Sequence, residues 1–559
     1  MNFTSPFSNH NLRIISLGGF GKVTSNMFVY EYGTDIILVD CGMGFPTEDM
    51  LGVDILIPDI SYLKTKMANI RGMVLTHGHE DHTGALAYIL PQLPNIPVYG
   101  SNLTANLVMD KLAEYANMPK QINILPTGKP IQLGRFTVES VHVSHSIPDA
   151  TNLIITTPVG TVYHGSDFKF DFTPINSPLP DVGRIAAAGN RGITLLLSDS
   201  LGSERSGFTP SERTLTETFA REIADCPGKF IVSTMSSNIS RWQQAADAAI
   251  KNGRKIAIMG RSIDRNIKVA MRLKYFNLPQ NAFVDLRNVK KMNPKQVCML
   301  VAGSQAQPGS ALERLANNES KDVEILPGDK VIFSSDYIPG NETAVQSLID
   351  SLSRMGATVI YSGIKDHLHV SGHGSQQDLL LMMALTRPKF LLPIGGTYRH
   401  MVQYSSLAQA AGYDAKQIIL PGLAQSIDVT QAGVKLGPVV EVKNVMVDGL
   451  GVGDVGNVVL RDRKVLAEEG VVVVVMEVDQ NDLSQIVKIE IMSRGFVYDK
   501  ENTQLINLAT IHLQKIIDTK KGHIESERHL RQIAIDTLEK YFFEQTHRRP
   551  MILPIVVLV

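Results

Sequence analysis

Residues 76–84 read Thr76-His77-Gly78-His79-Glu80-Asp81-His82-Thr83-Gly84, directly after the apolar run Met73-Val74-Leu75. The stretch places three histidines and two carboxylates at the end of an expected strand. Imidazole nitrogen and carboxylate oxygen are the ligands that zinc and similar divalent metals take in proteins. If the strand ends in a sharp turn, a first pair, His77 and His79, points to one ion. A second pair, Asp81 and His82, then points to another. The alternative is a surface turn that merely carries histidines, but the spacing of four ligand-type residues favours a metal site.

Two strand ends further along the chain can complete such a site. His145 follows an expected strand at 136–143, and Asp167 follows another at 161–163. One ion would take the first pair with His145, the other would take the second pair, and Asp167 would bridge both. Two ions about 3.5–4 Å apart can hold a hydroxide for attack on a phosphodiester. Taken singly, His145 and Asp167 could equally be structural residues.

Asp40 precedes this cluster, at the end of the expected strand 36–39. It is either a turn aspartate or the hydrogen-bond partner that orients a ligating histidine from behind. The Gly18-Gly19-Phe20-Gly21 stretch lacks the Lys-Ser/Thr of a phosphate-binding loop, so we interpret it as a tight turn.

The composition is that of an ordinary globular chain. At 559 residues, with 44% hydrophobic residues and a net charge of −1, it should contain three or four domains. A near-zero charge provides no general attraction for nucleic acid, so any RNA must bind in a local groove. The three cysteines lack paired spacing, which favours a reducing compartment, and we expect a cytoplasmic protein. We find no signal peptide, and the longest apolar runs are shorter than the about 20 residues that span a bilayer.

The order of strands and helices divides the chain into four segments. In residues 1–205, strands alternate with helices and end in His and Asp, which predicts two sheet layers covered by helices. Residues 206–366 show regular β/α alternation, which predicts a parallel sheet. Residues 367–445 return to the first style, and 446–559 follow a glycine-rich stretch as a small α+β domain. The expected parallel strands are 230–233, 255–259, 297–302, 330–333 and 358–361.

The histidine cluster, with Asp40, His145 and Asp167 at their places, resembles the metallo-β-lactamase fold. The inserted β/α segment resembles the β-CASP domain of its nucleic-acid-processing members. Further motifs resemble bacterial ribonuclease J over nearly the whole chain. They occupy residues 17–21, 144–149, 207–212, 333–335, 339–342, 369–373, 447–454, 493–497 and 548–554.

The resemblance implies an α/β fold: a metallo-β-lactamase αββα sandwich (1–205 and 367–445), an inserted β-CASP parallel α/β domain (206–366) and a small α+β C-terminal domain (446–559). It implies a metal-dependent ribonuclease with 5′-to-3′ exonuclease and endonuclease activity in RNA processing and decay. Two Zn²⁺ ions are expected, with Mn²⁺ or Mg²⁺ as alternatives. The C-terminal domain would assemble the chain into a homodimer or homotetramer. The protein would belong to an RNA-degradation complex, and no association with a membrane is expected.

The resemblance also assigns roles to residues. His373 would protonate the leaving group as a general acid, Asp199 would support it, and Asp81 would join them in catalysis. The resemblance also implies that RNA with a 5′-monophosphate is the preferred substrate. Small residues in the corresponding pocket would let backbone N–H groups approach this anion. The expected substrate-binding residues are Ser236, Ser237, Asn238, His369, Val370, Ser371, Gly372 and His373.

One departure concerns the second ion. Where the family carries Pro-x-His-Gly-Glu, this chain reads Pro393-Ile394-Gly395-Gly396-Thr397, so a ligating histidine is replaced by Gly395. The second ion would keep only Asp81, His82 and Asp167, unless His400 swings in from five residues downstream. The chain is then either an active ribonuclease or a weakened RNA-binding subunit paired with an active paralogue. A lactonase or thioesterase of the same fold would need neither the β-CASP-like segment nor the tail domain.

Overall fold

The computed structural model describes residues 11–116, 118–119, 121–338, 340–365, 367–449, 451–480, 482–496 and 499–559. Pro339, Leu450 and Val497, which belong to motifs named above, lie outside the described residues. The chain divides into two compact units. Unit 1 comprises Met1–Phe45 and Leu56–Val445, and unit 2 comprises Pro46–Ile55 and Met446–Val559.

Unit 1 contains a sandwich of two sheets. The first has the order β20-β19-β1-β2-β3-β5-β6-β7 and the second β18-β12-β11-β10-β9-β8. Apolar side chains of both sheets share one core, which includes Val39, Val138 and Leu197. The first sheet comprises β1 (Leu12–Gly18), β2 (Met27–Tyr32), β3 (Asp35–Val39), β5 (Ile70–Leu75), β6 (Val98–Gly100), β7 (Asn123–Ile124), β19 (Gln425–Thr430) and β20 (Gly433–Val439). The second comprises β8 (Ile131–Leu133), β9 (Phe136–His142), β10 (Thr151–Thr157), β11 (Gly160–Gly165), β12 (Leu195–Asp199) and β18 (Phe390–Ile394).

Helices cover the outer faces of the sandwich. The second sheet packs its outer face against helices through a separate core that includes Ile185, Leu379 and Tyr404. The strand β12, next to the edge strand β18, is buried at every residue, as expected for a strand covered on both faces. The helices of this part are α1 (Glu80–Thr83), α2 (Leu86–Ile89), α3 (Asn102–Leu112), α4 (Val182–Arg191), α11 (Gln376–Thr386) and α12 (Tyr398–Ala410).

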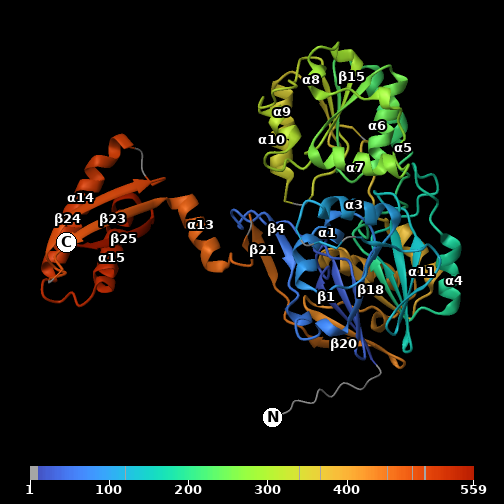
Figure 1. The fold of residues 1–559 in the computed structure, drawn as a ribbon, viewed down its shortest axis with the longest axis horizontal. Coiled ribbons are helices and arrows are strands. Elements are labelled where there is room, and N and C mark those ends of the chain that lie inside the picture. The colour runs from blue at the N-terminus through green and yellow to red at the C-terminus, as the bar shows by residue number, and fades with distance from the viewer. Residues whose placement is uncertain are drawn as a thin grey trace. The chain divides into compact units, whose positions relative to one another are not determined.

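Between β12 and α11 the chain forms a second lobe of unit 1, drawn in green to yellow in Figure 1. Its sheet has the order β14-β15-β13-β16-β17 and is parallel throughout. Apolar clusters cover both faces, and Leu103 and Leu107 of α3 join one of them. The strands are β13 (Phe230–Ser233), β14 (Lys255–Met259), β15 (Val297–Val301), β16 (Lys330–Phe333) and β17 (Thr358–Ile360). The helices are α5 (Thr214–Ala224), α6 (Ile239–Lys251), α7 (Arg261–Arg272), α8 (Leu286–Val289), α9 (Ala311–Ala316) and α10 (Glu342–Arg354).

Unit 2 carries a three-stranded sheet of order β24-β23-β25, with β23 antiparallel to β24 and parallel to β25. Burial alternates along β23, and Val472, Val474 and Met476 face the core under two helices. The elements are α13 (Asn457–Glu469), β23 (Val471–Val478), β24 (Ile486–Arg494), α14 (Asp499–Thr519), α15 (Glu527–Thr546) and β25 (Met551–Leu558). Short strands β4 (Ile55–Pro58), β21 (Asn444–Asp448) and β22 (Gly451–Val452) lie where the chain passes between units.

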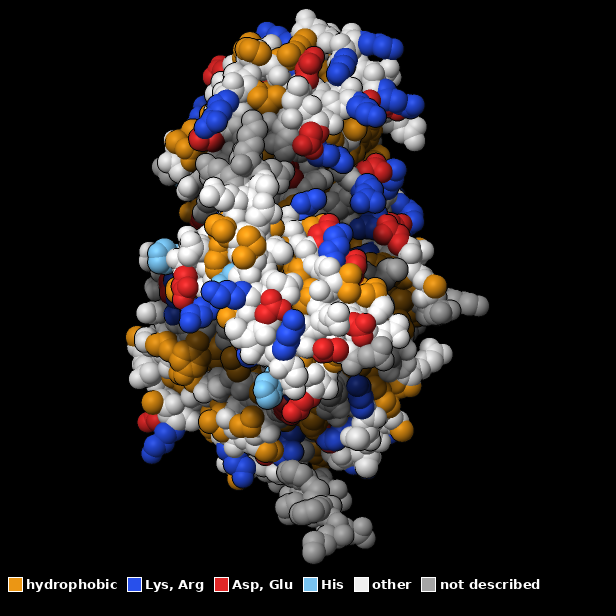
Figure 2. All heavy atoms as spheres, turned by 90° about the vertical axis from the view of Figure 1, so that its left-hand side faces the viewer, with side chains coloured by type: hydrophobic (Ala, Val, Ile, Leu, Met, Phe, Trp, Pro, Cys, Tyr) orange, Lys and Arg blue, Asp and Glu red, His pale blue; other side chains and the backbone are white. Residues whose placement is uncertain are grey.

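The structure and the predicted fold class agree: a two-sheet sandwich with an inserted parallel α/β lobe and a small α+β tail. After the histidine cluster, α2 is only a single helical turn followed by a tighter turn, because Pro91 interrupts the helix. Within the described residues no helix is long and apolar enough to cross a bilayer. On the face drawn in Figure 2, basic and acidic side chains are interspersed, in keeping with the net charge of −1.

Candidate metal centre

The site residues sit at strand ends along one edge of the sandwich. His77 follows β5, His79 caps α1, and His82 lies within α1. His145 lies three residues after β9, and Asp167 two residues after β11. Because β11, β12 and β18 are parallel, Asp199 at the end of β12 and Gly395 just after β18 reach the same edge. The fold therefore gathers at one place residues that are more than 300 positions apart.

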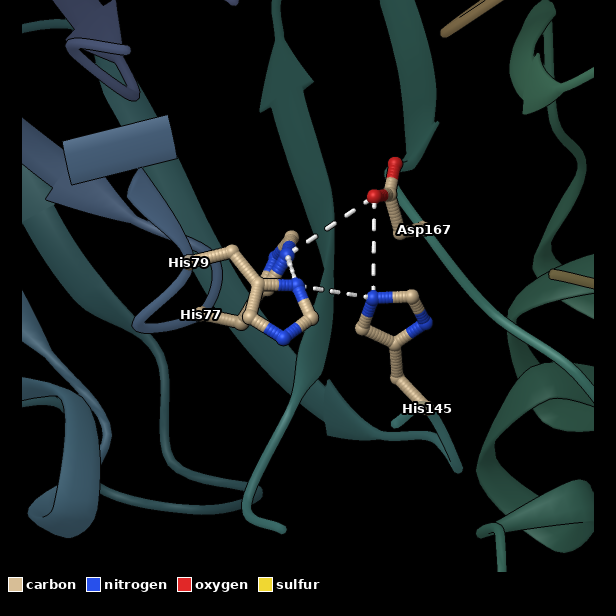
Figure 3. Close-up of side chains that lie close together, drawn as sticks. All are labelled: His77, His79, His145 and Asp167. Atoms are coloured by element: carbon tan, nitrogen blue, oxygen red, sulfur yellow. Dashed lines mark hydrogen bonds and ion pairs between the residues drawn. The ribbon is translucent and has the colours of Figure 1, made fainter. Parts of the chain in front are cut away.

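Three imidazole rings and one carboxylate form the first group. Nδ1 of His79 lies 3.1 Å from Nε2 of His77 and 3.0 Å from Nε2 of His145. Oδ2 of Asp167 lies 3.7 Å from Nε2 of both His77 and His145. Figure 3 shows the four side chains pointing toward a common point. These are the residues expected for the first ion, and their ligand atoms lie within 4.8 Å of one another.

The protonation states of this group suit a cation. Burial, with the neighbouring imidazoles, lowers the pKa of His77 and His79 well below the usual value. Burial also lowers the pKa of His145 to about 3. The rings are therefore neutral at pH 7, and three nitrogen lone pairs converge on one point beside a carboxylate. A divalent metal ion fits this donor set, which is typical of zinc and also tolerated by manganese.

The rings are held in place by hydrogen bonds at their other nitrogens. Nδ1 of His145 donates to the backbone oxygen of Gly372 over 2.7 Å, and Nδ1 of His77 lies 3.0 Å from Oγ1 of Thr76. Such bonds orient a ligating imidazole and select its tautomer. Thr76 had no assigned role at the level of sequence, since a threonine at a strand end carries no distinctive pattern.

The second group comprises Asp81, His82 and Asp167. Nε2 of His82 lies 3.3 Å from Oδ2 of Asp167 and 3.6 Å from Oδ2 of Asp81. Nδ1 of His82 lies 2.7 Å from Oδ2 of Asp40, and Asp40 also accepts from the backbone N–H and hydroxyl of Thr76. Of the two readings of Asp40, the geometry places it behind a histidine. Burial raises the pKa of Asp81 to about 6.

Gly395 borders this second group. A Cβ atom built there would lie 3.6 Å from Oδ1 of Asp167 and 3.7 Å from Oδ1 of Asp199. A side chain at 395 would thus start beside the carboxylates of Asp167 and Asp199, and glycine supplies no donor. His400 does not fill the gap, because its Nδ1 accepts from Thr397 as part of the cap of α12. Among the described residues, no group that could hold a metal includes His400.

His373 faces the same edge with Asp199 behind it. Its Nδ1 lies 2.7 Å from Oδ2 of Asp199, and its Nε2 lies 3.9 Å from Oδ2 of Asp167. Burial lowers the pKa of His373, but Asp199, Asp167 and Asp81 outweigh it and raise the pKa to about 9. A protonated Nε2 is therefore available beside the carboxylates at pH 7.

The expected substrate-binding residues lie on two segments. Ser236 and Ser237 are half-buried just before α6, whereas the side chain of Asn238 caps that helix by accepting from the backbone N–H of Arg241. Val370 is buried, so only its backbone can contribute. At Gly372 a Cβ atom would lie 2.7 Å from the ring of His145, so only glycine fits between the segment and the first group.

Known families match three parts of the chain. The metallo-beta-lactamase superfamily matches residues 20–212, the ribonuclease J beta-CASP domain residues 227–352, and the ribonuclease J C-terminal domain residues 458–559. Ribonuclease J2 of Bacillus subtilis is 38% identical over 98% of this chain and 99% of its own length. Ribonuclease J of Thermus thermophilus is 37% identical over 98% of this chain and 95% of its own length.

A crystal structure of a protein of unknown function from Enterococcus faecalis also resembles this chain, with a TM-score of 0.52 at 16% identity. The match covers 75% of this chain and all of the Enterococcus faecalis chain, and it supports the fold alone. These relatives are 37–38% identical to this chain over nearly its whole length, and three family domains match it. The chain therefore belongs to the ribonuclease J family.

Proposed function

We propose that the chain is a metal-dependent ribonuclease that hydrolyses phosphodiester bonds of RNA, preferably from a 5′-monophosphorylated end. The observation that carries this proposal is the convergence of three neutral imidazoles with Asp167, opposite the hydrogen-bonded pair of His373 and Asp199. Family membership supports the substrate class, since the relatives are named as ribonucleases.

The first group would hold one ion, and Asp81, His82 and Asp167 would hold a second. Such ions, when bound, activate water at neutral pH and stabilise charge on the reacting phosphate. The protein's own residues do the rest. Water attacks phosphorus, the bond to the leaving 3′ oxygen breaks, and His373 donates a proton to that oxygen. Asp199 holds the ring of His373 and stabilises its charged form.

The 5′-phosphate would bind between the segment 369–372 and the start of α6. That helix has 13 residues, and its positive N-terminal end, where Asn238 caps the backbone N–H of Arg241, directly follows residues 236 and 237. Ser236 and Ser237 lie at this end and retain partial exposure. The arrangement suits a terminal monophosphate, because backbone donors and a helix N-terminus favour a compact anion.

A second candidate function follows from Gly395. With three protein ligands, the second ion binds less tightly, and the chain would then act as a weakened RNA-binding subunit. Zinc, manganese and magnesium should be supplied separately to metal-stripped protein, with 5′-monophosphorylated RNA as substrate. Two bound ions and stepwise release of nucleotides support the enzyme, whereas RNA binding without turnover under every metal supports the weakened subunit.

Self-association would use the open face of the unit 2 sheet. Leu553, Ile555 and Val557 of β25 are 44%, 47% and 40% exposed, and the register pairs them with Val473, Val475 and Glu477 of β23 in that order. Exposed apolar rows of this kind mark an interaction surface. A second copy of the chain is the proposed occupant, which sedimentation analysis tests directly.

The free, buried cysteines Cys41, Cys226 and Cys298 support a reducing, cytoplasmic compartment.

A further inference from the structure

Arg241 in α6 is fully buried and makes four hydrogen bonds through its guanidinium. Nη1 donates to the backbone oxygen of Ser334 over 2.7 Å and to Nδ1 of His369 over 2.8 Å. Nη2 donates to Oε2 of Glu212 over 2.6 Å and to the backbone oxygen of Val370 over 3.1 Å. One side chain thus joins the inserted lobe to the segment 369–370, which enters the expected phosphate pocket.

The contact with His369 determines which ring nitrogen carries the proton. A guanidinium can only donate, so Nδ1 of His369 must accept and Nε2 must bear the hydrogen. Burial and the charge of Arg241 lower the pKa of His369 to about 4, so the ring is neutral at pH 7. His369 therefore offers Nε2–H as a donor. This nitrogen lies 3.8 Å from Oδ2 of Asp336, and the His369 side chain remains 22% exposed.

Glu212 balances the charge of Arg241 and extends the network toward the metal centre. Its Oε1 accepts from Nζ of Lys169 over 3.2 Å, and Lys169 lies two residues after Asp167. Burial of Glu212 is outweighed by Arg241 and Lys169, which lower its pKa to about 2. The ion pairs are buried, so loss of either partner would leave an uncompensated charge.

We propose that Arg241 is a positioning residue. It holds the segment 369–372 in register with the start of α6, and it fixes the tautomer of His369 that donates to the RNA phosphate. The proposal rests on the proposed function for its substrate. Lysine cannot replace Arg241 in this role, because it places a single ammonium where arginine presents a planar fork to four acceptors.

Arg254 provides a matched control. It is also buried in the inserted lobe and donates to four backbone oxygens, those of Ile223, Cys226, Gly228 and Val297. Val297 begins β15, whereas Ser334 follows the end of β16, so Arg254 acts at the opposite end of the same parallel sheet. Replacement of Arg254 by lysine should affect the lobe without affecting the segment 369–372.

The first experiment is hydrogen exchange on full-length protein, which does not depend on catalysis. Arg241→Lys should speed exchange of the amides in 369–373 about tenfold, the effect of losing about one charged hydrogen bond. Arg254→Lys should leave that segment as in the wild type. Equal exchange of 369–373 in wild type and Arg241→Lys would overturn the proposal. If Arg241→Lys does not fold, the double variant Arg241→Met with Glu212→Gln takes its place, in which Lys169 keeps Asp171 at 4.0 Å, and the same readout applies.

The second experiment measures cleavage of 5′-monophosphorylated and 5′-hydroxyl RNA. Arg241→Lys should raise KM for the monophosphorylated substrate about tenfold, with kcat changed less than about twofold, because the metal ligands are untouched. Arg254→Lys should change neither constant. A fall in kcat with KM unchanged would contradict a positioning role. If the wild type cleaves no RNA at all, the proposed function fails, while the exchange data still decide the role of Arg241.

Discussion

Replacement of Gly395 by histidine should tighten binding of the second metal ion. The Cβ atom would lie 3.6 and 3.7 Å from oxygens of Asp167 and Asp199, which are ordinary contact distances, and apart from the adjacent residues no other heavy atom lies within 4 Å. A Cβ atom at position 395 is therefore accommodated beside the second group, and the imidazole attached to it would start next to these carboxylates. Because a ligand contributes at least as much as the groups that orient it, metal affinity should rise at least about tenfold, or about 1.4 kcal/mol.

The same substitution carries a backbone cost that must be separated from the gain. Gly395 has φ +67°, a left-handed conformation that costs a residue with a side chain roughly 1 kcal/mol. This strain is present with and without metal, so it lowers the free energy of unfolding of the metal-free protein but not its metal affinity. Gly395→Ala carries the same strain without a nitrogen donor and is the matched control.

The assay is chelator competition on metal-stripped protein, with the number of bound ions counted by mass spectrometry, beside cleavage of 5′-monophosphorylated RNA. We expect Gly395→His to bind the second ion more tightly than wild type, and Gly395→Ala to bind it like wild type. Equal affinity in the His and Ala variants would refute the reasoning that position 395 borders the second ion. Tighter binding without a rise in cleavage would show that the second ion does not limit activity.

Four further outcomes follow from the same geometry. His373→Gln should lower kcat by about 10²–10⁴ with little change in KM, and wild-type kcat should fall as pH rises past about 9, where His373 loses its proton. The pKa of Glu212 in the folded protein, about 2, lies below its ordinary value of 4.5, so ionised Glu212 stabilises the fold fully above pH 4.5 and progressively less as pH falls. In urea unfolding, the free-energy advantage of wild type over Glu212→Gln should therefore shrink by about 2 kcal/mol from pH 7 to pH 3. Ile555→Asp should shift sedimentation toward the single chain if the open sheet face is the interface, and an unchanged distribution would exclude that face. Asp40→Asn should weaken metal binding about 10–100-fold by loosening His82, measured by the same chelator competition.

Local sequence determined much of the fold because burial patterns are local. The strands β13, β14 and β16 have the bounds expected from their apolar runs. By contrast, β10 and β12 were not anticipated, although both are buried almost throughout. Short apolar runs with few turn residues around them resemble many other buried segments, and only pairing with β11 shows them to be strands.

The histidine cluster at 77–82 was evident from sequence because its ligands lie within one turn of chain, and metal chemistry restricts which side chains can serve. The tertiary structure decided what no spacing shows. It brought Gly395 to within contact distance of Asp167, engaged His400 in a helix cap, and buried Arg241 between two distant segments. The physical reason is that ligand type is a local property of a side chain, whereas the approach of one strand end to another depends on the packing of the whole sandwich.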